Sequence, residues 1–250
     1  MSRDFKSLTF NGHDLFAECG LIIQEKKAFS APARDVTSQP VPGRSGNLII
    51  DNDRFENRSQ PYVCAIMPGF ASGQADLVAV AARLKSILMR DSGYKELRDD
   101  YALGAFYRAS YHSALDIEEI LTQTGKVTLT FDCEPYMFTN AGQQAITATA
   151  SPYVLTNPEE YNARPKITIN GTGNVTITIN NALGNNAFNL TGIATGTVID
   201  SELMEAFQGS ASANSKMLNP NFPILAPGTN TIQRTGSVTS LVIIPRWCRL

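Results

Sequence analysis

The side chains that could most readily act as bases, nucleophiles or metal ligands are few in this chain: two histidines and four cysteines. His13 and His112 lie far apart in the sequence, so a Ser/His or Cys/His dyad has few options. The cysteines lack the close Cys-x-x-Cys spacing that a zinc site would require. They are Cys19, Cys64, Cys133 and Cys248. We therefore expect free thiols packed as small apolar groups and predict no metal site.

Three short segments resemble catalytic or ligand-binding motifs, and each lacks an essential residue. Gly69–Gly73 has alanine where a nucleophile elbow needs serine. Asp51–Asp53 begins like a calcium loop, but Glu56 stands where the loop needs glycine. Gly171–Gly173 lacks the third glycine and the βαβ context of a dinucleotide site. We predict no catalytic residue and no cofactor, and interpret Gly171–Gly173 as a turn.

Composition restricts the class of protein further. The chain has 250 residues, of which 43% are hydrophobic and 18% charged, and its net charge of −2 gives no basic footprint for nucleic acid. It has no apolar run of about 18 residues, as a membrane span would need. The first ten residues, MSRDFKSLTF, lack the apolar stretch of a secretory signal. We expect a globular protein made and kept in a cytoplasm.

The two halves of the chain differ in character. Residues 1–138 hold 33 of the 44 charged side chains, whereas residues 139–250 hold 11 together with 14 Asn and 15 Thr. A shift this sharp predicts a domain boundary, with domains at 1–138 and 139–250. The polar segment Thr139–Gln144 is a plausible linker.

Hydrophobic periodicity predicts one helix and several strands in the first half. Apolar residues recur at helical spacing in Ala75–Met89, with Ser72 as a possible N-cap. Alternation predicts strands at Val127–Cys133 and Ala105–His112. Shorter apolar runs make Leu48–Ile50 and Tyr62–Met67 further candidates.

The segment from Ala28 to Arg58 lacks clear periodicity. It is long, charged and proline-bearing, which is typical of a mobile surface loop. The same features suit an arm that reaches a neighbouring subunit, and the sequence leaves both readings open. The candidate arm residues are Pro32, Arg34, Pro42, Gly43, Arg44, Arg54 and Arg58.

The second half consists of short strands and turns, which favours a β-sandwich. Lys166–Asn170 and Asn174–Asn180, joined by Gly171–Gly173, predict a hairpin. Further strands are expected at Thr195–Ile199, Asn230–Arg234 and Val238–Ile244.

β-Sandwiches can bind sugars by stacking aromatic side chains on the sugar ring, and this half has scattered aromatics. The candidate contacts are Tyr153, Tyr161 and Trp247. For Trp247, a core or domain-contact role is the stronger expectation.

Several segments, in one order over nearly the whole chain, resemble the distal tail (Dit) protein family of long-tailed bacteriophages. Each is weak alone, and their combination is fairly specific. In the first half they are Phe10–Gly12 with Gly20-Leu21, Pro42–Gly46, Tyr94–Leu97 with Asp99, Phe106–Ala109, Gly125-Lys126 and Thr130–Pro135. In the second half they are Asn157-Pro158, Pro165–Ile169, Ile199–Glu202, Phe222–Asn230 and Pro245–Trp247.

The resemblance implies a structural virion protein that forms a hexameric ring at the tail tip. In such proteins the N-terminal domain builds the ring and its lumen, through which DNA passes without specific binding. The C-terminal domain is a galectin-like β-sandwich. The ring joins the tail tube protein to the hub, fibre or lysin protein and can dock receptor-binding proteins. Assembly would take place in the host cytoplasm.

We therefore expect a mainly β (α+β) protein, with a β-rich N-terminal domain containing one amphipathic helix and a C-terminal galectin-like β-sandwich. The expected function is assembly, with no catalysis and no membrane insertion. A carbohydrate-binding module of a cell-surface-recognising protein is the alternative. A hydrolase is disfavoured, because no dyad is apparent.

Overall fold

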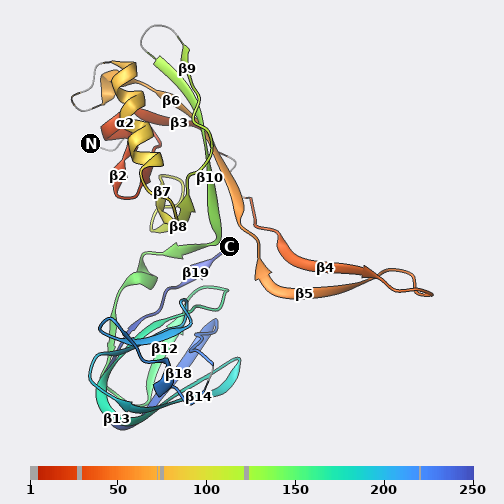
Figure 1. Ribbon diagram of the computed structural model, residues 1–250, viewed down its shortest axis with the longest axis vertical. Helices are drawn as coiled ribbons and strands as arrows, with labels where there is room; N and C mark the ends of the chain where they lie inside the picture. The colour runs from red at the N-terminus through yellow and green to blue at the C-terminus, as the bar shows by residue number, and fades with distance from the viewer. Residues whose placement is uncertain (1–4, 27–29, 72, 74–75, 121–123, 220) are drawn as a thin grey trace. The chain divides into compact units, whose positions relative to one another are not determined.

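The computed structural model describes residues 5–26, 30–71, 73, 76–120, 124–219 and 221–250 (Figure 1). The chain is mainly β, as the sequence predicts, and it divides into two compact units. Unit 1 comprises Met1–Met137 with Leu250, and unit 2 comprises Phe138–Arg249. Of the helices described, none has the length and apolar character to cross a bilayer.

The described part of unit 1 is built on a nine-stranded sheet in which neighbouring strands such as β1 (Leu8–Phe10) and β7 (Lys95–Asp99), β6 (Arg58–Ile66) and β10 (Thr124–Thr139), and β3 (Leu21–Lys26) and β6 are antiparallel. Its ends approach each other, because the Ile23 amide donates to the Lys6 carbonyl oxygen (2.8 Å) and Ser7 Oγ donates to the Leu21 carbonyl oxygen (3.0 Å). The sheet thus curls toward a barrel. Its path is β2 (His13–Asp14), β1, β7, β8 (Ala105–Ser110), β10, β6 and β3, with β9 (Ile117–Ile120) and β19 (Cys248–Arg249) each paired to β10.

Local sequence explains how the chain enters this sheet. Asn11 and Gly12 both have positive φ, as the two-residue turn between β1 and β2 requires. Asp14 then caps α1 (Leu15–Cys19) by accepting from the amides of Phe16 and Ala17. Gly20 ends α1 in the left-handed conformation, and any side chain there would collide with the Met67 carbonyl oxygen at 2.0 Å.

The predicted helix is confirmed as α2 (Leu77–Met89), which follows the short 3-10 helix η1 (Pro68–Phe70). Val80, Leu84, Ile87 and Leu88 are buried and Leu77 packs against the same core, as the apolar spacing predicts. The helix N-cap is Asp76, whose side chain makes no capping bond. The alternative cap, Ser72, lies outside the described residues.

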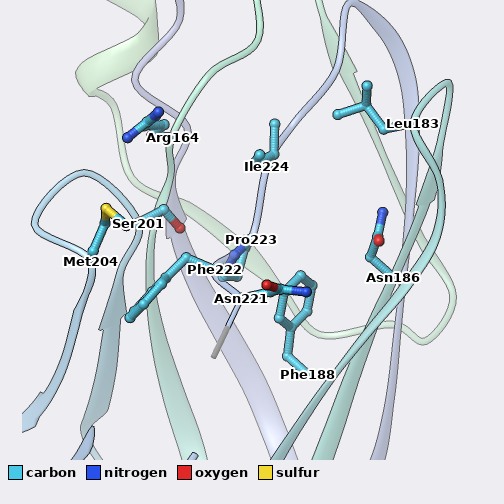
Figure 2. A pocket seen from close by; sticks show the side chains of 10 residues that line it. All are labelled: Arg164, Leu183, Asn186, Phe188, Ser201, Met204, Asn221, Phe222, Pro223 and Ile224. Carbon is cyan, nitrogen blue, oxygen red and sulfur yellow. The ribbon is translucent and has the colours of Figure 1, made fainter. Parts of the chain in front are cut away.

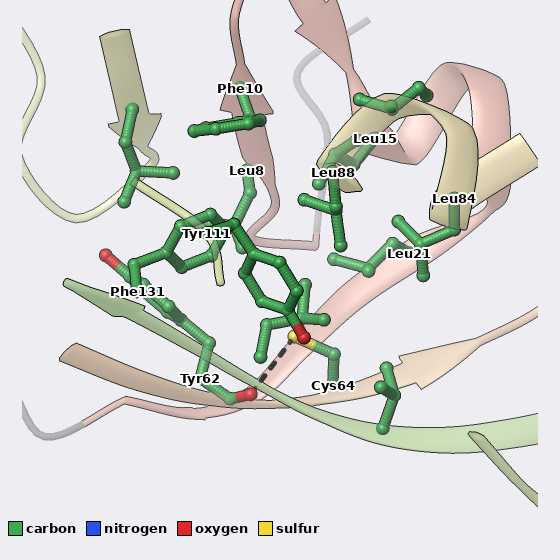
Figure 3. Packing of buried hydrophobic residues seen from close by; sticks show 14 of the residues in the cluster. Leu8, Phe10, Leu15, Leu21, Tyr62, Cys64, Leu84, Leu88, Tyr111 and Phe131 are labelled. Carbon is green, nitrogen blue, oxygen red and sulfur yellow. Dashed lines mark hydrogen bonds between the residues drawn. The ribbon is translucent and has the colours of Figure 1, made fainter. Parts of the chain in front are cut away.

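The core of unit 1 is aromatic and continuous (Figure 3). Phe131 of β10 lies at its centre, with ring centroids 5.2 Å from Phe10 and 5.3 Å from Tyr111. The strands predicted at Val127–Cys133, Ala105–His112 and Tyr62–Met67 correspond to β10, β8 and β6, apart from their ends. Phe106 and Tyr107, on opposite faces of β8, are both buried, so this strand is covered on both sides.

The interpretation of residues 28–58 as a mobile loop is wrong for most of this segment. Residues 34–55 form an antiparallel hairpin of β4 (Arg34–Pro40) and β5 (Asn47–Phe55), which is a sheet of its own. The Leu48–Ile50 run lies inside β5. The periodicity is obscured because this hairpin has no buried face to impose one. Residues 27–29, where the segment begins, lie outside the described part of the chain.

Unit 2 is a β-sandwich organised by two long strands, β13 (Lys166–Asn181) and β18 (Gly228–Ile244), which pair along most of their length. Bulges near Gly171 bend the pair, so that its two ends belong to two layers. Both ends bury residues in one core, including Ile169, Ile177 and Leu241. The other strands are β11 (Ile146–Ala148), β12 (Tyr153–Asn157), β14 (Gly184–Ile193), β15 (Thr197–Asp200), β16 (Glu205–Gln208), β17 (Ala211–Ser212) and β19 (Cys248–Arg249), with 3-10 helices η2 (Ala141–Gln143) and η3 (Asn214–Lys216).

One sequence prediction in unit 2 is wrong: the hairpin expected around Gly171–Gly173 is the single bent strand β13. The strands expected at Asn230–Arg234 and Val238–Ile244 are confirmed, and they are continuous in β18. Position 171 needs a glycine because a Cβ there would lie 2.5 Å from the Ser237 carbonyl oxygen. Gly171 therefore lets β18 approach β13 closely, whereas the sequence predicted that this glycine forms a turn.

The segment Thr139–Gln144, expected to be a linker, is an ordered turn of unit 2. The Thr139 amide donates to the Trp247 carbonyl oxygen (3.0 Å), and the Arg246 amide donates to the Gly142 carbonyl oxygen (2.7 Å). Gly142 is buried against Trp247, where a Cβ would lie 2.3 Å from the backbone nitrogen. Both bonds to the chain end join backbone groups, so no local sequence pattern reveals them.

Candidate functional site: an exposed hairpin arm

The β4–β5 hairpin, called the arm below, extends beyond the rest of unit 1 (Figure 1). Its strands pair from Pro40 and Asn47 inward to Val36 and Asp51. The tip is Val41–Gly46, in which Gly43 and Gly46 have positive φ and the Arg44 amide donates to the Val41 carbonyl oxygen (3.2 Å). The Pro-Gly-Arg-x-Gly segment singled out in the sequence is therefore a tight turn at the end of the arm.

Both faces of the arm carry exposed apolar side chains. Leu48 and Ile50 point to one face together with their partners Gln39 and Thr37, since directly paired residues share a face. Ile49 and Val36 point to the other, and Ile49 is 59% exposed. A two-stranded hairpin alone is marginally stable in water. Exposed apolar side chains on both faces of a hairpin are typical of a surface that binds another molecule.

Ion pairs and a bulge stiffen the middle of the arm. The Arg34 guanidinium donates to Asp51 from Nε (2.7 Å) and again from Nη2. Across the bulge, Arg54 pairs with Asp35 (3.0 Å). The hydrogen bonds from Arg34 hold the pKa of Asp51 below its usual range. Exposed pairs contribute little stability, so their effect is mainly to fix geometry.

The root of the arm is fixed to the core of unit 1 by aromatic and polar contacts. The Phe55 ring lies edge-on to Tyr136 (centroids 6.0 Å apart). The Arg58 guanidinium lies over the Tyr107 ring (4.4 Å to the centroid) and donates to the Ser30 carbonyl oxygen. These contacts hold the base of the arm firmly while its outer part stays exposed.

The structure gathers most of the predicted arm residues on this hairpin. Arg34, Pro42, Gly43, Arg44 and Arg54 are exposed on it, Arg58 lies at its root, and Pro32, which precedes β4, is buried. Sequence reasoning missed the apolar members, Val36, Ile49 and Ile50, as surface residues. The Leu48–Ile50 run was the available signal, but an apolar run is ordinarily a buried strand.

The polar side chains elsewhere in unit 1 form structural contacts. His13 Nδ1 lies 2.9 Å from Glu18 Oε1, and His112 Nδ1 lies 3.1 Å from Ser110 Oγ. Burial raises the pKa of Glu18, but hydrogen bonds from Arg83 and His13 to its carboxylate outweigh this effect and hold the pKa below its usual value. Within the described ranges, no three His, Cys, Asp or Glu side chains gather as a metal site. All four cysteines are buried free thiols, as expected.

Unit 2 contains a cavity of about 350 Å³ between the β13–β14, β15–β16 and pre-β18 loops (Figure 2). Its polar groups are the guanidinium of Arg164, two amides and the buried Ser201 hydroxyl, which has no hydrogen-bond partner in the part of the chain described. Among the described residues, the lining has no carboxylate, imidazole or amine that could act as a general acid or base. The ten lining residues are Arg164, Leu183, Asn186, Phe188, Ser201, Met204, Asn221, Phe222, Pro223 and Ile224.

The candidate sugar-contact aromatics of unit 2 differ in exposure. Trp247 is 4% exposed and belongs to the core, so its ring is unavailable to stack on a sugar. Tyr153 is half-buried and packs on the same core. Tyr161 is also half-buried, and its carbonyl oxygen accepts from Asn157 Nδ2 (2.9 Å). None of the three lines the cavity.

The fold described above, a curled sheet with a projecting arm followed by a bent-strand β-sandwich, is similar to that of a solved phage protein. That protein is Dit (gp 19.1) of phage SPP1, described as a paradigm of the hub adsorption apparatus of phages that infect Gram-positive bacteria. The likeness covers 98% of this chain and 99% of that one, with a TM-score of 0.74 and 16% sequence identity. No family model and no curated protein matches the sequence.

Proposed function

We propose that this protein is a distal tail protein: a structural, non-catalytic subunit of a phage tail that forms a ring, expected to be hexameric, at the tail tip. The observation that carries the proposal is the fold shared with SPP1 Dit over nearly the full length of both chains. The ordered sequence segments that resemble this family point the same way. Residues 1–138 would build the ring and its lumen, and residues 139–250 would form the outer β-sandwich.

The arm supports the assembly part of the proposal. A closed ring of identical subunits uses two different surfaces of each subunit. An exposed hairpin that is apolar on both faces supplies one such surface, and burying it on a neighbour would also protect its strand edges from aggregation.

The proposed role as a distal tail protein also implies which proteins this chain would bind. The ring would join the tail tube protein to the hub, fibre or lysin protein and could dock receptor-binding proteins, after assembly in the host cytoplasm. DNA would pass through the lumen without specific binding. The net charge of −3 over residues 1–138 agrees with a bore that does not attract phosphate.

The test is the absolute mass of the purified protein, measured by light scattering after size exclusion over a range of concentrations. We expect a species of six times the 27.1 kDa monomer, and ring-shaped particles by electron microscopy. A protein that remains monomeric at every concentration, and also when mixed with its tail tube protein, would contradict the ring.

Arm variants separate assembly from folding. Ile49→Lys and Ile50→Lys place a charge on opposite faces of the arm, at positions exposed in the subunit, so each variant should fold and fail to assemble. Val154→Lys is the matched control, because Val154 is 60% exposed on β12 of unit 2. Rings formed equally well by all three variants would remove the arm from the interface.

A further inference from the structure

A second exposed apolar surface of unit 1 is a cluster of three phenylalanines beside α1. The rings of Phe5, Phe16 and Phe70 contact one another, with centroids 6.0 to 6.5 Å apart. Phe5 and Phe70 are exposed and Phe16 is half-buried. Exposed aromatic clusters of this kind are typical of interface cores.

The cluster is extended by the loop between β7 and β8. Leu103 on this loop is 83% exposed, and it lines a hollow of about 430 Å³ together with Phe5, Lys6 and Asp100. We call the five residues Phe5, Phe16, Phe70, Asp100 and Leu103 the aromatic patch.

The charges of the arm and the aromatic patch are complementary. Arg44 at the arm tip and Asp100 in the patch are both exposed, and neither forms an ion pair with another described residue. The nearby Lys6 ammonium lies over the Tyr101 ring (4.1 Å) and donates to the Asp100 carbonyl oxygen (3.3 Å). The Ser7 amide donates to Asp100 Oδ2 (2.7 Å), and the negative charge of this carboxylate is balanced by no cation among the described residues.

The two surfaces also lie on different sides of unit 1. Phe16 belongs to α1, which the Glu18–Arg83 ion pair joins to α2, and the arm leaves the unit on the side away from α2 (Figure 1). An arm cannot cover a patch on the far side of its own unit. Two separated, complementary surfaces are what a head-to-tail contact between identical subunits requires.

We propose that the arm of one subunit binds the aromatic patch of the next, with Ile49 and its apolar neighbours against the phenylalanines and Arg44 paired to Asp100. This inference rests on the proposed ring and identifies the two surfaces that would close it. The occupant of the patch is a second copy of this chain.

Cross-linking between engineered cysteines tests the contact, because all four native cysteines are buried. Ser38→Cys labels the Ile49 face of the arm, and Gly69→Cys labels the patch at an exposed glycine with open space around it. Neither substitution removes an apolar side chain. A short bis-maleimide added to an equal mixture of the two variants should yield cross-linked dimers that contain one subunit of each variant. The double variant should yield a series of cross-linked oligomers of increasing size. Ser38→Cys with Val154→Cys is the control pair.

The outcomes separate the inference from the ring itself. Ring-sized protein without a Ser38→Cys/Gly69→Cys cross-link overturns the inference and leaves the ring standing. Cross-linking of Ser38→Cys alone would mean that arms pair with arms, which also overturns it. Monomeric protein throughout overturns both proposals.

A charge swap supplies an independent readout. Arg44→Asp and Asp100→Lys should each raise the concentration needed for assembly about fivefold, the scale of an exposed ion pair. The double variant should recover most of the loss. Additive losses in the double variant would contradict the pairing of Arg44 with Asp100.

Discussion

The ammonium nitrogen of Lys26 lies 2.5 Å from Oδ2 of Asp99, and their side chains are only 5% and 0% exposed. The same carboxylate oxygen accepts from the Tyr62 hydroxyl at 2.7 Å, and the other accepts from the amides of Tyr101 and Ala102. Burial, together with the adjacent carboxylate, raises the pKa of Tyr62, which keeps its hydroxyl a donor. The pair ties the end of β3 to the end of β7 close to the point where the chain leaves for the arm.

Asp99→Ala should destabilise unit 1 by about 3–5 kcal/mol, because it leaves a buried ammonium without its partner. The measurement is urea unfolding followed by tyrosine near-UV circular dichroism. Trp247, the one tryptophan, lies in unit 2, so its fluorescence reports the other unit and should change little.

Asp91→Ala is the matched control for this prediction. Asp91 lies 4.0 Å from Lys95 at the surface, where an ion pair contributes at most about 1 kcal/mol. Equal losses for Asp91→Ala and Asp99→Ala would show that the buried pair has no special role.

In unit 2, the ion pair of Asp200 and Arg246 predicts a dependence of stability on acid. Arg246 donates to both carboxylate oxygens, at 2.6 and 2.8 Å. Burial alone would raise the pKa of Asp200, but the hydrogen bonds from Arg246 and from backbone amides outweigh it and hold that pKa below its usual 3.8. The stabilisation is therefore complete above about pH 4 and is lost as the pH falls through the lowered pKa.

Asp200→Asn should flatten that acid dependence and cost about 2–3 kcal/mol near neutral pH, since Arg246 loses its bidentate partner and keeps only the ion pair with Glu202 (3.1 Å). Trp247 fluorescence during urea unfolding at several pH values measures both effects. Glu160→Gln, at an exposed carboxylate, should leave the profile unchanged. An Asp200→Asn profile parallel to that of the unsubstituted protein would exclude Asp200 as the titrating group.

Gly171→Ala tests the bent-strand description of unit 2. The added Cβ would lie 2.5 Å from the Ser237 carbonyl oxygen, so β13 and β18 would have to separate, at a cost of about 1–3 kcal/mol. Gly69→Ala is the control, with open space and an ordinary φ. If Gly171→Ala unfolds like the control, Gly171 lies in an open turn as the sequence suggested.

The four native thiols should resist a thiol reagent in the folded protein. Burial raises the pKa of Cys19 to about 11 and that of Cys64 and Cys133 to about 12, and only a thiolate reacts. Colorimetric titration should find essentially no reactive thiol without denaturant and all four in urea. An Ile49→Cys variant, whose new thiol lies on the exposed arm, should show one additional thiol that reacts at once without denaturant. Rapid reaction of the unsubstituted protein would invalidate the cross-linking design.

Backbone hydrogen exchange should report whether the arm is covered. In the free subunit the β4–β5 amides lie in a two-stranded ladder open to water, so they should exchange rapidly. Assembly should slow the exchange of the Thr37 and Ile50 amides more than that of buried β10 amides, which are already protected. Unchanged arm exchange in ring-sized protein would show that the arm stays free.

Where a helix or strand is buried on one face only, the sequence was sufficient to predict that element. Leu84 and Leu88 recur at helical spacing and Val127 and Leu129 alternate, because each set packs against a single core. The mainly β fold followed from these local patterns, and the resemblance carried by many short ordered segments predicted the fold that the chain shares with SPP1 Dit.

Only the tertiary structure decided the features that depend on distant residues. The sequence shows Gly171 but not the β18 backbone that crowds it, and shows Thr139–Gln144 but not the chain end to which it bonds. Asp200 and Arg246 lie in two of the resembling segments, yet their bidentate contact needs the folded sandwich. The arm is the clearest case: its apolar residues lie on both faces, so no period marks it as a hairpin, and the partner expected to bury it belongs to another molecule.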